Sequence, residues 1–96
     1  LNICHNEISV LPEEIGRLTK LEHLYFGMNR NISEIPDQIA NCVNLKGLDL
    51  GSTNISVLPE WIGSLSELVG INIGGANISW STVLMNLSRR GVIVDE

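Results

Sequence analysis

Aromatic residues are scarce in this chain, and their scarcity limits the kind of core that it can build. Only 4% of the 96 residues are aromatic, whereas 44% are hydrophobic. The core must therefore consist of leucine, isoleucine and valine side chains that make many small contacts. A chain of this length corresponds to one domain, without the deep cleft of a self-sufficient enzyme.

Basic residues and long apolar runs are also lacking. Six lysines and arginines stand against eleven aspartates and glutamates, which leaves a net charge of −5. Nucleic acids and anionic membranes attract proteins of the opposite charge, so we expect neither as a partner. No apolar run approaches the ~18 residues that would span a bilayer, and no charged-then-apolar leader opens the sequence.

Soft metal ligands are limited to Cys4, His5, His23 and Cys42, and two cysteines are too few for a disulfide scaffold. Along parallel strands, the Cys4-His5 pair would lie about five positions from His23, or roughly 16 Å. Zinc needs its ligands about 2 Å from one centre. We therefore expect no metal, no cofactor and no disulfide, and we expect Cys42 to act as a small buried hydrophobic residue.

No arrangement typical of catalysis is present. Cys4 and His5 are neighbours on one strand and should point to opposite faces, and no acidic residue orients His5. The Gly74-Gly75 pair lacks the lysine and the helix start of a phosphate-binding loop. The sequence therefore predicts no catalytic residue and no enzymatic activity.

What the sequence does contain is an internal repeat. Pro12, Pro36 and Pro59 lie 24 and then 23 residues apart, and aligning on them brings the aliphatic residues into phase. The aligned core positions are Leu21, Leu24 and Phe26; Leu45, Leu48 and Leu50; and Leu68, Ile71 and Ile73. A unit of this length must reverse its direction, and units that cannot bury their apolar sides alone can do so by stacking.

Each unit predicts one short strand and one helical turn. Alternation in segments such as Leu48-Asp49-Leu50 is typical of a strand with one buried face. Each proline suits the first position of a helical turn, and the carboxylates that follow it lie near the positive end of the turn's dipole.

The last stretch departs from this pattern. Residues 80–90 predict a longer helix, with Leu84 and Leu87 on its inner side. Ser79 or Ser81 is expected to cap its start, and Gly91 to stop it. Residues 92–94 then predict one more strand, with a register defined only to within one residue.

The segments L-E-H-L-Y-F-G-M-N and L-K-G-L-D-L-G-S-T, each followed by I-S-x-[LI]-P-x-x-I, resemble the leucine-rich repeat. The resemblance covers nearly the whole chain. It implies an α/β solenoid, a right-handed superhelix with parallel strands on the concave face and short helical turns on the convex face. It also implies a ladder of buried asparagines, a role that Asn6 and Asn29 fit. Thr53 would fill this role only in part, and Ala76 cannot fill it.

We expect a single domain of about four repeats. They occupy residues 1–20 (partial), 21–44, 45–67 and 68–90, and residues 79–96 form an irregular C-terminal capping unit. The first unit starts inside a strand without a polar covering, so we expect a piece of a longer protein. If the piece exists alone, its unpaired strand edge predicts an edge-to-edge homodimer.

Four sequons begin at Asn31, Asn54, Asn77 and Asn86, and the first three share one phase of the repeat. Asparagine and serine also satisfy backbone groups in turns, and glycosylation requires a secreted chain. A cytoplasmic location is therefore favoured over secretion, and the phased sequons keep secretion open.

Function is then expected on the inner face of the strands. Six of the nine glycines fall on this face, although glycine is disfavoured in strands. Either a partner approaches closely over the glycines, with Tyr25 and Met28 as anchors, or the short repeats merely tolerate them. The predicted partner-binding residues are Asn2, His5, His23, Tyr25, Met28, Lys46, Asp49 and Asn72.

We therefore predict a protein-interaction module that binds a protein partner through its concave face. The repeats resemble intracellular signalling, plant and bacterial types, so the subclass stays open. The alternative is a structural or sensor segment of a larger signalling protein, immune receptor or effector enzyme. The full reading frame of the parent distinguishes these alternatives, because an effector enzyme would carry an adjoining catalytic domain.

Overall fold

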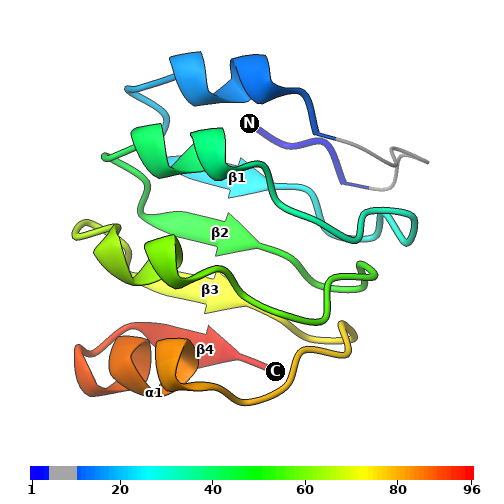
Figure 1. Cartoon of the computed structure of the whole chain (residues 1–96), viewed down its shortest axis with the longest axis vertical. Coiled ribbons are helices and arrows are strands. Elements are labelled where there is room, and N and C mark those ends of the chain that lie inside the picture. Colours follow the sequence, from blue (N-terminus) through cyan, green and yellow to red (C-terminus); the bar gives the residue numbers. More distant parts are fainter. Residues whose placement is uncertain (5–10) are drawn as a thin grey trace.

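Four short parallel strands form one sheet in the order β1-β2-β3-β4 in the computed structural model, which describes residues 1–4 and 11–96. The strands are β1 (His23–Tyr25), β2 (Gly47–Asp49), β3 (Gly70–Asn72) and β4 (Ile93–Asp95). They follow one another along the long axis of the molecule, and helical segments cover one side of the sheet (Figure 1). The predicted α/β solenoid of leucine-rich-repeat type is confirmed. His5 and Asn6 lie outside the described residues.

The sheet register places equivalent residues of successive repeats in rows. Strands β1, β2 and β3 bury their central residue and direct their first and third residues to the other face, and β4 partly buries its central residue Val94. The first row contains His23, Gly47, Gly70 and Ile93, and the third row contains Tyr25, Asp49, Asn72 and Asp95. Asn2 extends the third row, because it forms a parallel bridge with Tyr25.

In the described part of the chain, three 3-10 helical turns occupy the convex side. They are η1 (Glu13–Arg17), η2 (Asp37–Asn41) and η3 (Glu60–Ser64). Each follows its proline, so the prediction of a helical turn at this place is confirmed. The prediction that proline takes the first helical position is wrong, since Pro12, Pro36 and Pro59 have extended ψ angles of 146°, 137° and 148°. Their carbonyls accept the first bond of each turn, as Pro12 does from the backbone N–H of Ile15 at 3.1 Å.

The C-terminal helix α1 (Thr82–Arg89) buries Leu84 and Leu87, as predicted. It ends at Arg89 with Arg90 as its C-cap residue, and the next residue is Gly91, whose φ of 91° favours glycine. Ser81 occupies the N-cap position, but its hydroxyl makes no capping hydrogen bond and is buried without a partner among the described residues. The prediction that a serine side chain caps the start of this helix is therefore wrong. The last strand begins at Ile93, one residue later than predicted.

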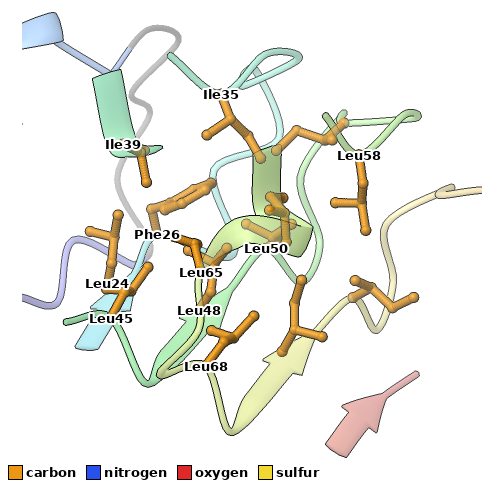
Figure 2. Close-up of a cluster of buried hydrophobic side chains, with 14 of the residues drawn as sticks. Leu24, Phe26, Ile35, Ile39, Leu45, Leu48, Leu50, Leu58, Leu65 and Leu68 are labelled. Atoms are coloured by element: carbon orange, nitrogen blue, oxygen red, sulfur yellow. The ribbon is translucent and has the colours of Figure 1, made fainter. Parts of the chain in front are cut away.

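The core is a continuous column of aliphatic side chains from successive repeats around the single Phe26 (Figure 2). Leu24, Leu48 and Leu50 are almost fully buried, which confirms the phase read from the repeat. Cys42 is fully buried, and its Sγ lies 3.6 Å from the carbonyl oxygen of Ile15 in the preceding repeat. Its role as a small hydrophobic residue is confirmed.

A buried amide joins two repeats where the chain leaves the sheet. The Nδ2 group of Asn29 donates to the carbonyls of Phe26 at 2.7 Å and of Ile3, in the preceding repeat, at 3.0 Å. Thr53 stands in the same place one repeat later. Its hydroxyl donates to the Leu50 carbonyl at 2.8 Å and accepts from the Ile55 backbone N–H at 3.4 Å, and both partners lie in its own repeat. The ladder role predicted for Asn29 and the shorter reach of Thr53 are thus confirmed.

Candidate functional site on the concave face

The concave face carries a hollow of about 460 Å³, which we call the concave hollow. Both rows of outward-facing strand residues contribute to it, together with two residues that precede the strands. Its lining consists of His23, Tyr25, Lys46, Gly47, Leu48, Asp49, Val69, Gly70, Ile71, Asn72 and Asp95. Five of the predicted partner-binding residues therefore meet here. Asn2 and Met28 do not line the concave hollow, and His5 lies outside the described residues.

One wall of the concave hollow is a pair of rings on β1. The rings of His23 and Tyr25 stack with their centroids 5.8 Å apart and their planes at 26°. The Tyr25 hydroxyl and His23 Nδ1 are also hydrogen-bonded at 3.2 Å. This pair leans over β2, because a Cβ placed on Gly47 would lie 2.9 Å from His23 Nδ1. The missing side chain of Gly47 therefore makes room for the rings.

Three further glycines follow the strands and allow neighbouring repeats to approach closely. A Cβ on Gly27 would lie 2.8 Å from the Gly51 carbonyl oxygen, and one on Gly51 would lie 2.9 Å from the Gly74 carbonyl oxygen. A Cβ on Gly74 would lie 3.0 Å from the backbone of Glu96. These glycines are needed by the backbone of the solenoid itself.

Gly70 differs from the other glycines of this face. Gly75 has a φ of 76°, which disfavours any side chain there. A Cβ on Gly70, by contrast, would meet only the Ile93 carbonyl oxygen, at an ordinary distance of 3.7 Å. Among the described residues, nothing inside the chain requires a glycine at position 70, which lies open at the floor of the concave hollow.

The charges around the concave hollow are unevenly distributed. Lys46 Nζ forms an ion pair with Glu22 Oε2 at 2.9 Å. This hydrogen-bonded pair lowers the pKa of the Glu22 carboxyl group and raises the pKa of the Lys46 ammonium group. Neither Asp49 nor Asp95 has an ion-pair partner in the described part of the chain. The end of the concave hollow at the C-termini of the strands is therefore acidic.

Asp49 and Asn72 share a local structure although they differ in charge. Asp49 Oδ1 accepts a hydrogen bond from the backbone N–H of Gly51 at 2.9 Å. Asn72 Oδ1 accepts the equivalent bond from Gly74 at 2.8 Å, one strand further on. Each side chain closes the turn after its strand. One carboxylate oxygen of Asp49 is used in this way, and the charge remains on the surface.

The predicted binding set omits Gly70 and Asp95. Gly70 could have been selected only by knowing that the neighbouring unit leaves room there for a side chain. Asp95 was missed because the register of the last strand was open by one residue. The signal was present, since Asp95 follows Asn72 by one repeat of 23 residues, and the sheet pairs the two.

Several other predicted features lie away from the concave hollow. Within residues 1–4 and 11–96, no cluster of three or more histidine, cysteine or acidic side chains is arranged to bind a metal ion. Cys4 and Cys42 are thiols, and burial raises the pKa of both. No helix in the same part of the chain has the length and apolarity needed to cross a bilayer. The sequon asparagines are exposed, and Asn86 lies within α1.

Comparison with known proteins agrees with this architecture. The Leucine Rich Repeat family model matches residues 20–42 and 44–65, which are two consecutive units of the solenoid. These two matches support the predicted resemblance to the leucine-rich-repeat family. Over 50 residues, or 52% of its length, the chain is also 40% identical to a protein named adenylate cyclase from Schizosaccharomyces pombe (strain 972 / ATCC 24843). The chain spans 3% of the length of that relative.

Proposed function

We propose that this chain is a protein-interaction module that binds a protein partner through the concave hollow, without chemistry of its own. The observation that carries this proposal is Gly70. A glycine inside a strand weakens the strand, and no contact within the described chain requires one at this position. Its presence keeps the floor of the concave hollow low, which suits a surface that another molecule must approach.

The walls of the concave hollow supply the contacts that such a partner would need. Tyr25 is 36% exposed, and its ring is held by the stacking and hydrogen bond with His23. A ring that is already fixed loses little side-chain entropy when a partner packs against it. Aromatic residues of this kind often contribute much of the affinity at protein interfaces.

Photocrosslinking tests this proposal with two matched valines. Val69 lines the concave hollow and is 58% exposed, whereas Val43 lies outside the lining and is 57% exposed. We expect a photoreactive phenylalanine analogue at position 69, in the protein expressed in its own cells, to crosslink a defined partner protein. The same analogue at position 43 should not. Equal crosslinking from both positions, or from position 43 alone, would contradict the proposal.

A pair of glycine substitutions adds a second test. Gly70→Ala places a methyl group on the floor of the concave hollow, and Gly63→Ala places one in open space on the convex turn η3. Neither methyl group clashes with the described chain. We expect Gly70→Ala to weaken capture of the crosslinked partner, and Gly63→Ala to leave it unchanged. The joint substitution Tyr25→Ala with Met28→Ala should abolish capture without loss of stability.

A second candidate is favoured by the adenylate cyclase match. In it, the chain is a structural or sensor segment of a larger signalling protein, since the matched segment is a small part of a long relative. We propose in either case that residues 1–96 form one domain, with residues 79–96 as its C-terminal capping unit. An edge-to-edge homodimer stays a prediction. The complete reading frame of the parent gene tests the second candidate, because it would reveal an adjoining signalling or catalytic domain.

A further inference from the structure

The open part of the concave hollow is a notch above Gly70. On one side, the rings of His23 and Tyr25 lean across β2 and fill the space over Gly47. On the other side, Ile93 pairs with Gly70 in the register and exposes its side chain on β4. Neighbouring strands lie about 4.8 Å apart. The walls stand over β2 and β4, two strand spacings apart, so the notch leaves the space over Gly70 on β3 open, and its long direction is parallel to the strands.

The two ends of this notch differ in character. At the end where the strands begin, the exposed side chains of Val69 and Ile93 are apolar. At the end where the strands finish, the carboxylates of Asp49 and Asp95 stand on either side of Asn72. Two residues along a strand span about 6.6 Å. A side chain with an aliphatic stem and a cationic head matches both ends, because its stem suits the apolar end and its head suits the acidic end.

The charges of the site favour the same kind of ligand. Lys46 also lines the concave hollow, but its charge is offset by the ion pair with Glu22. The remaining negative charges are those of Asp49 and Asp95. The whole chain carries a net charge of −5, which attracts basic segments and repels acidic ones. The ring pair adds a flat aromatic wall. A guanidinium group stacks on aromatic faces and binds carboxylates with two parallel hydrogen bonds, whereas an ammonium group does neither as well.

We propose that the partner places an arginine side chain in the notch above Gly70, an inference that rests on the function proposed above. The stem of the arginine lies against Val69 and Ile93, and its guanidinium group reaches Asp49 and Asp95 beside the Tyr25 ring. The partner is therefore a protein that exposes an arginine side chain.

The test is an NMR titration of the ¹⁵N-labelled chain with the capped peptide acetyl-Gly-Arg-Gly-amide. Matched peptides carry glutamine or glutamate in place of arginine. We expect the arginine peptide to shift the amide signals of Gly70 and Asp49 in a saturable way. The glutamine peptide should bind about tenfold more weakly, because it lacks the charge-assisted bonds. The glutamate peptide should cause no saturable shift.

Two variants of the chain serve as the matched pair. Asp49→Asn removes one charge and should keep the turn after β2. Asn72 closes the equivalent turn after β3 with the oxygen of its side-chain amide. Glu60→Gln removes one exposed charge from the convex turn η3. We expect Asp49→Asn to weaken binding of the arginine peptide about tenfold, and Glu60→Gln to leave it unchanged.

The outcomes separate this inference from the proposed function. Equal binding of the arginine and glutamine peptides, equal effects of the two variants, or no saturable shift at Gly70 would each overturn the arginine inference. The function proposed above would still stand if crosslinking at position 69 captures a partner. If that crosslinking fails while the arginine peptide shifts Gly70 as expected, the notch binds arginine, and the wider partner surface is refuted.

Discussion

The Nδ1 atom of His23 lies 2.9 Å from the point that a β-carbon on Gly47 would occupy. The two residues face each other across β1 and β2 in the first row of the sheet. The absence of a side chain on β2 thus determines where a ring of β1 can lie. This relationship supports the ring pair that forms one wall of the concave hollow.

The substitution Gly47→Ala should disturb that wall. The added methyl group would displace the His23 ring and break its hydrogen bond with the Tyr25 hydroxyl. We expect the nuclear Overhauser effects between the two rings to disappear in NMR spectra, with a change of about 1 kcal/mol or less in the free energy of unfolding. Gly70→Ala is the control, because its methyl group meets no ring and the effects should persist.

Removal of the buried amide should cost much more. Asn29→Ala would leave the Phe26 and Ile3 carbonyls without their donor, and we expect a loss of about 2–4 kcal/mol in unfolding free energy by urea denaturation. Asn29→Thr should lose less, because Thr53 shows that a hydroxyl can still serve the nearer carbonyl. A loss no larger for Asn29→Ala than for Asn29→Thr would contradict the ladder role.

Packing of the C-terminal helix predicts a contrast between two of its residues. Leu87 is fully buried in the core, whereas Met85 is 41% exposed. Leu87→Ala should lower the free energy of unfolding by about 2–5 kcal/mol, through lost burial and the cavity left behind. Met85→Ala should change it by less than about 0.5 kcal/mol. Similar losses for both variants in chemical denaturation would show that α1 does not cover the core as described.

The Glu22–Lys46 pair predicts a pH dependence of stability. The pKa of Glu22 is lowered from 4.5, so its contribution is complete above that value and is lost as the pH falls through the folded-state pKa. The pKa of Lys46 is raised from 10.5, so its contribution is complete below that value and is lost as the pH rises through the folded-state pKa.

Lys46→Gln should accordingly raise the pKa of Glu22 towards its ordinary value, as followed by the ¹³C signal of its carboxyl carbon. Added salt should have the same effect in the unaltered chain, since both groups are exposed. A Glu22 titration that is indifferent to Lys46→Gln would argue against the ion pair.

The two cysteines should differ in reactivity towards a disulfide reagent. Burial raises the pKa of the Cys42 thiol, and its side chain is fully enclosed, so we expect it to react only when the chain unfolds. The pKa of Cys4 is raised by burial and then by the charge of Asp49. Cys4 should therefore react more slowly than a model thiol at pH 8, and Asp49→Asn should accelerate it. Glu60→Gln should not change its rate.

Much of the fold could be predicted because the repeat encodes it several times. The phase of Leu24, Leu48 and Ile71 defines which face of each strand is buried, and the register follows from stacking. The last strand could be placed only to within one residue, because the helix before it replaces the usual turn. Pro36 was expected at the first position of its helical turn, but its ψ angle is extended, and the sequence does not reveal that angle.

The candidate site was harder to predict than the fold. Alternation identified the outward-facing residues His23, Tyr25 and Asp49, and the structure brings them together. It could not separate Gly47 and Gly51, which make room for other parts of the chain, from Gly70, which does not. That distinction depends on distances between repeats. The glycines cannot be distinguished in the sequence, because their roles depend on how closely the neighbouring repeat approaches each of them.

The equivalent turns closed by Asp49 and Asn72 have a consequence for how the charge of the concave face can change during evolution. Aspartate and asparagine codons differ by one nucleotide, and both residues close the turn after their strand with the same kind of hydrogen bond. A lineage can therefore add or delete a negative charge at these places while its scaffold stays intact. Surface charge and foldability can therefore change nearly independently at these two places.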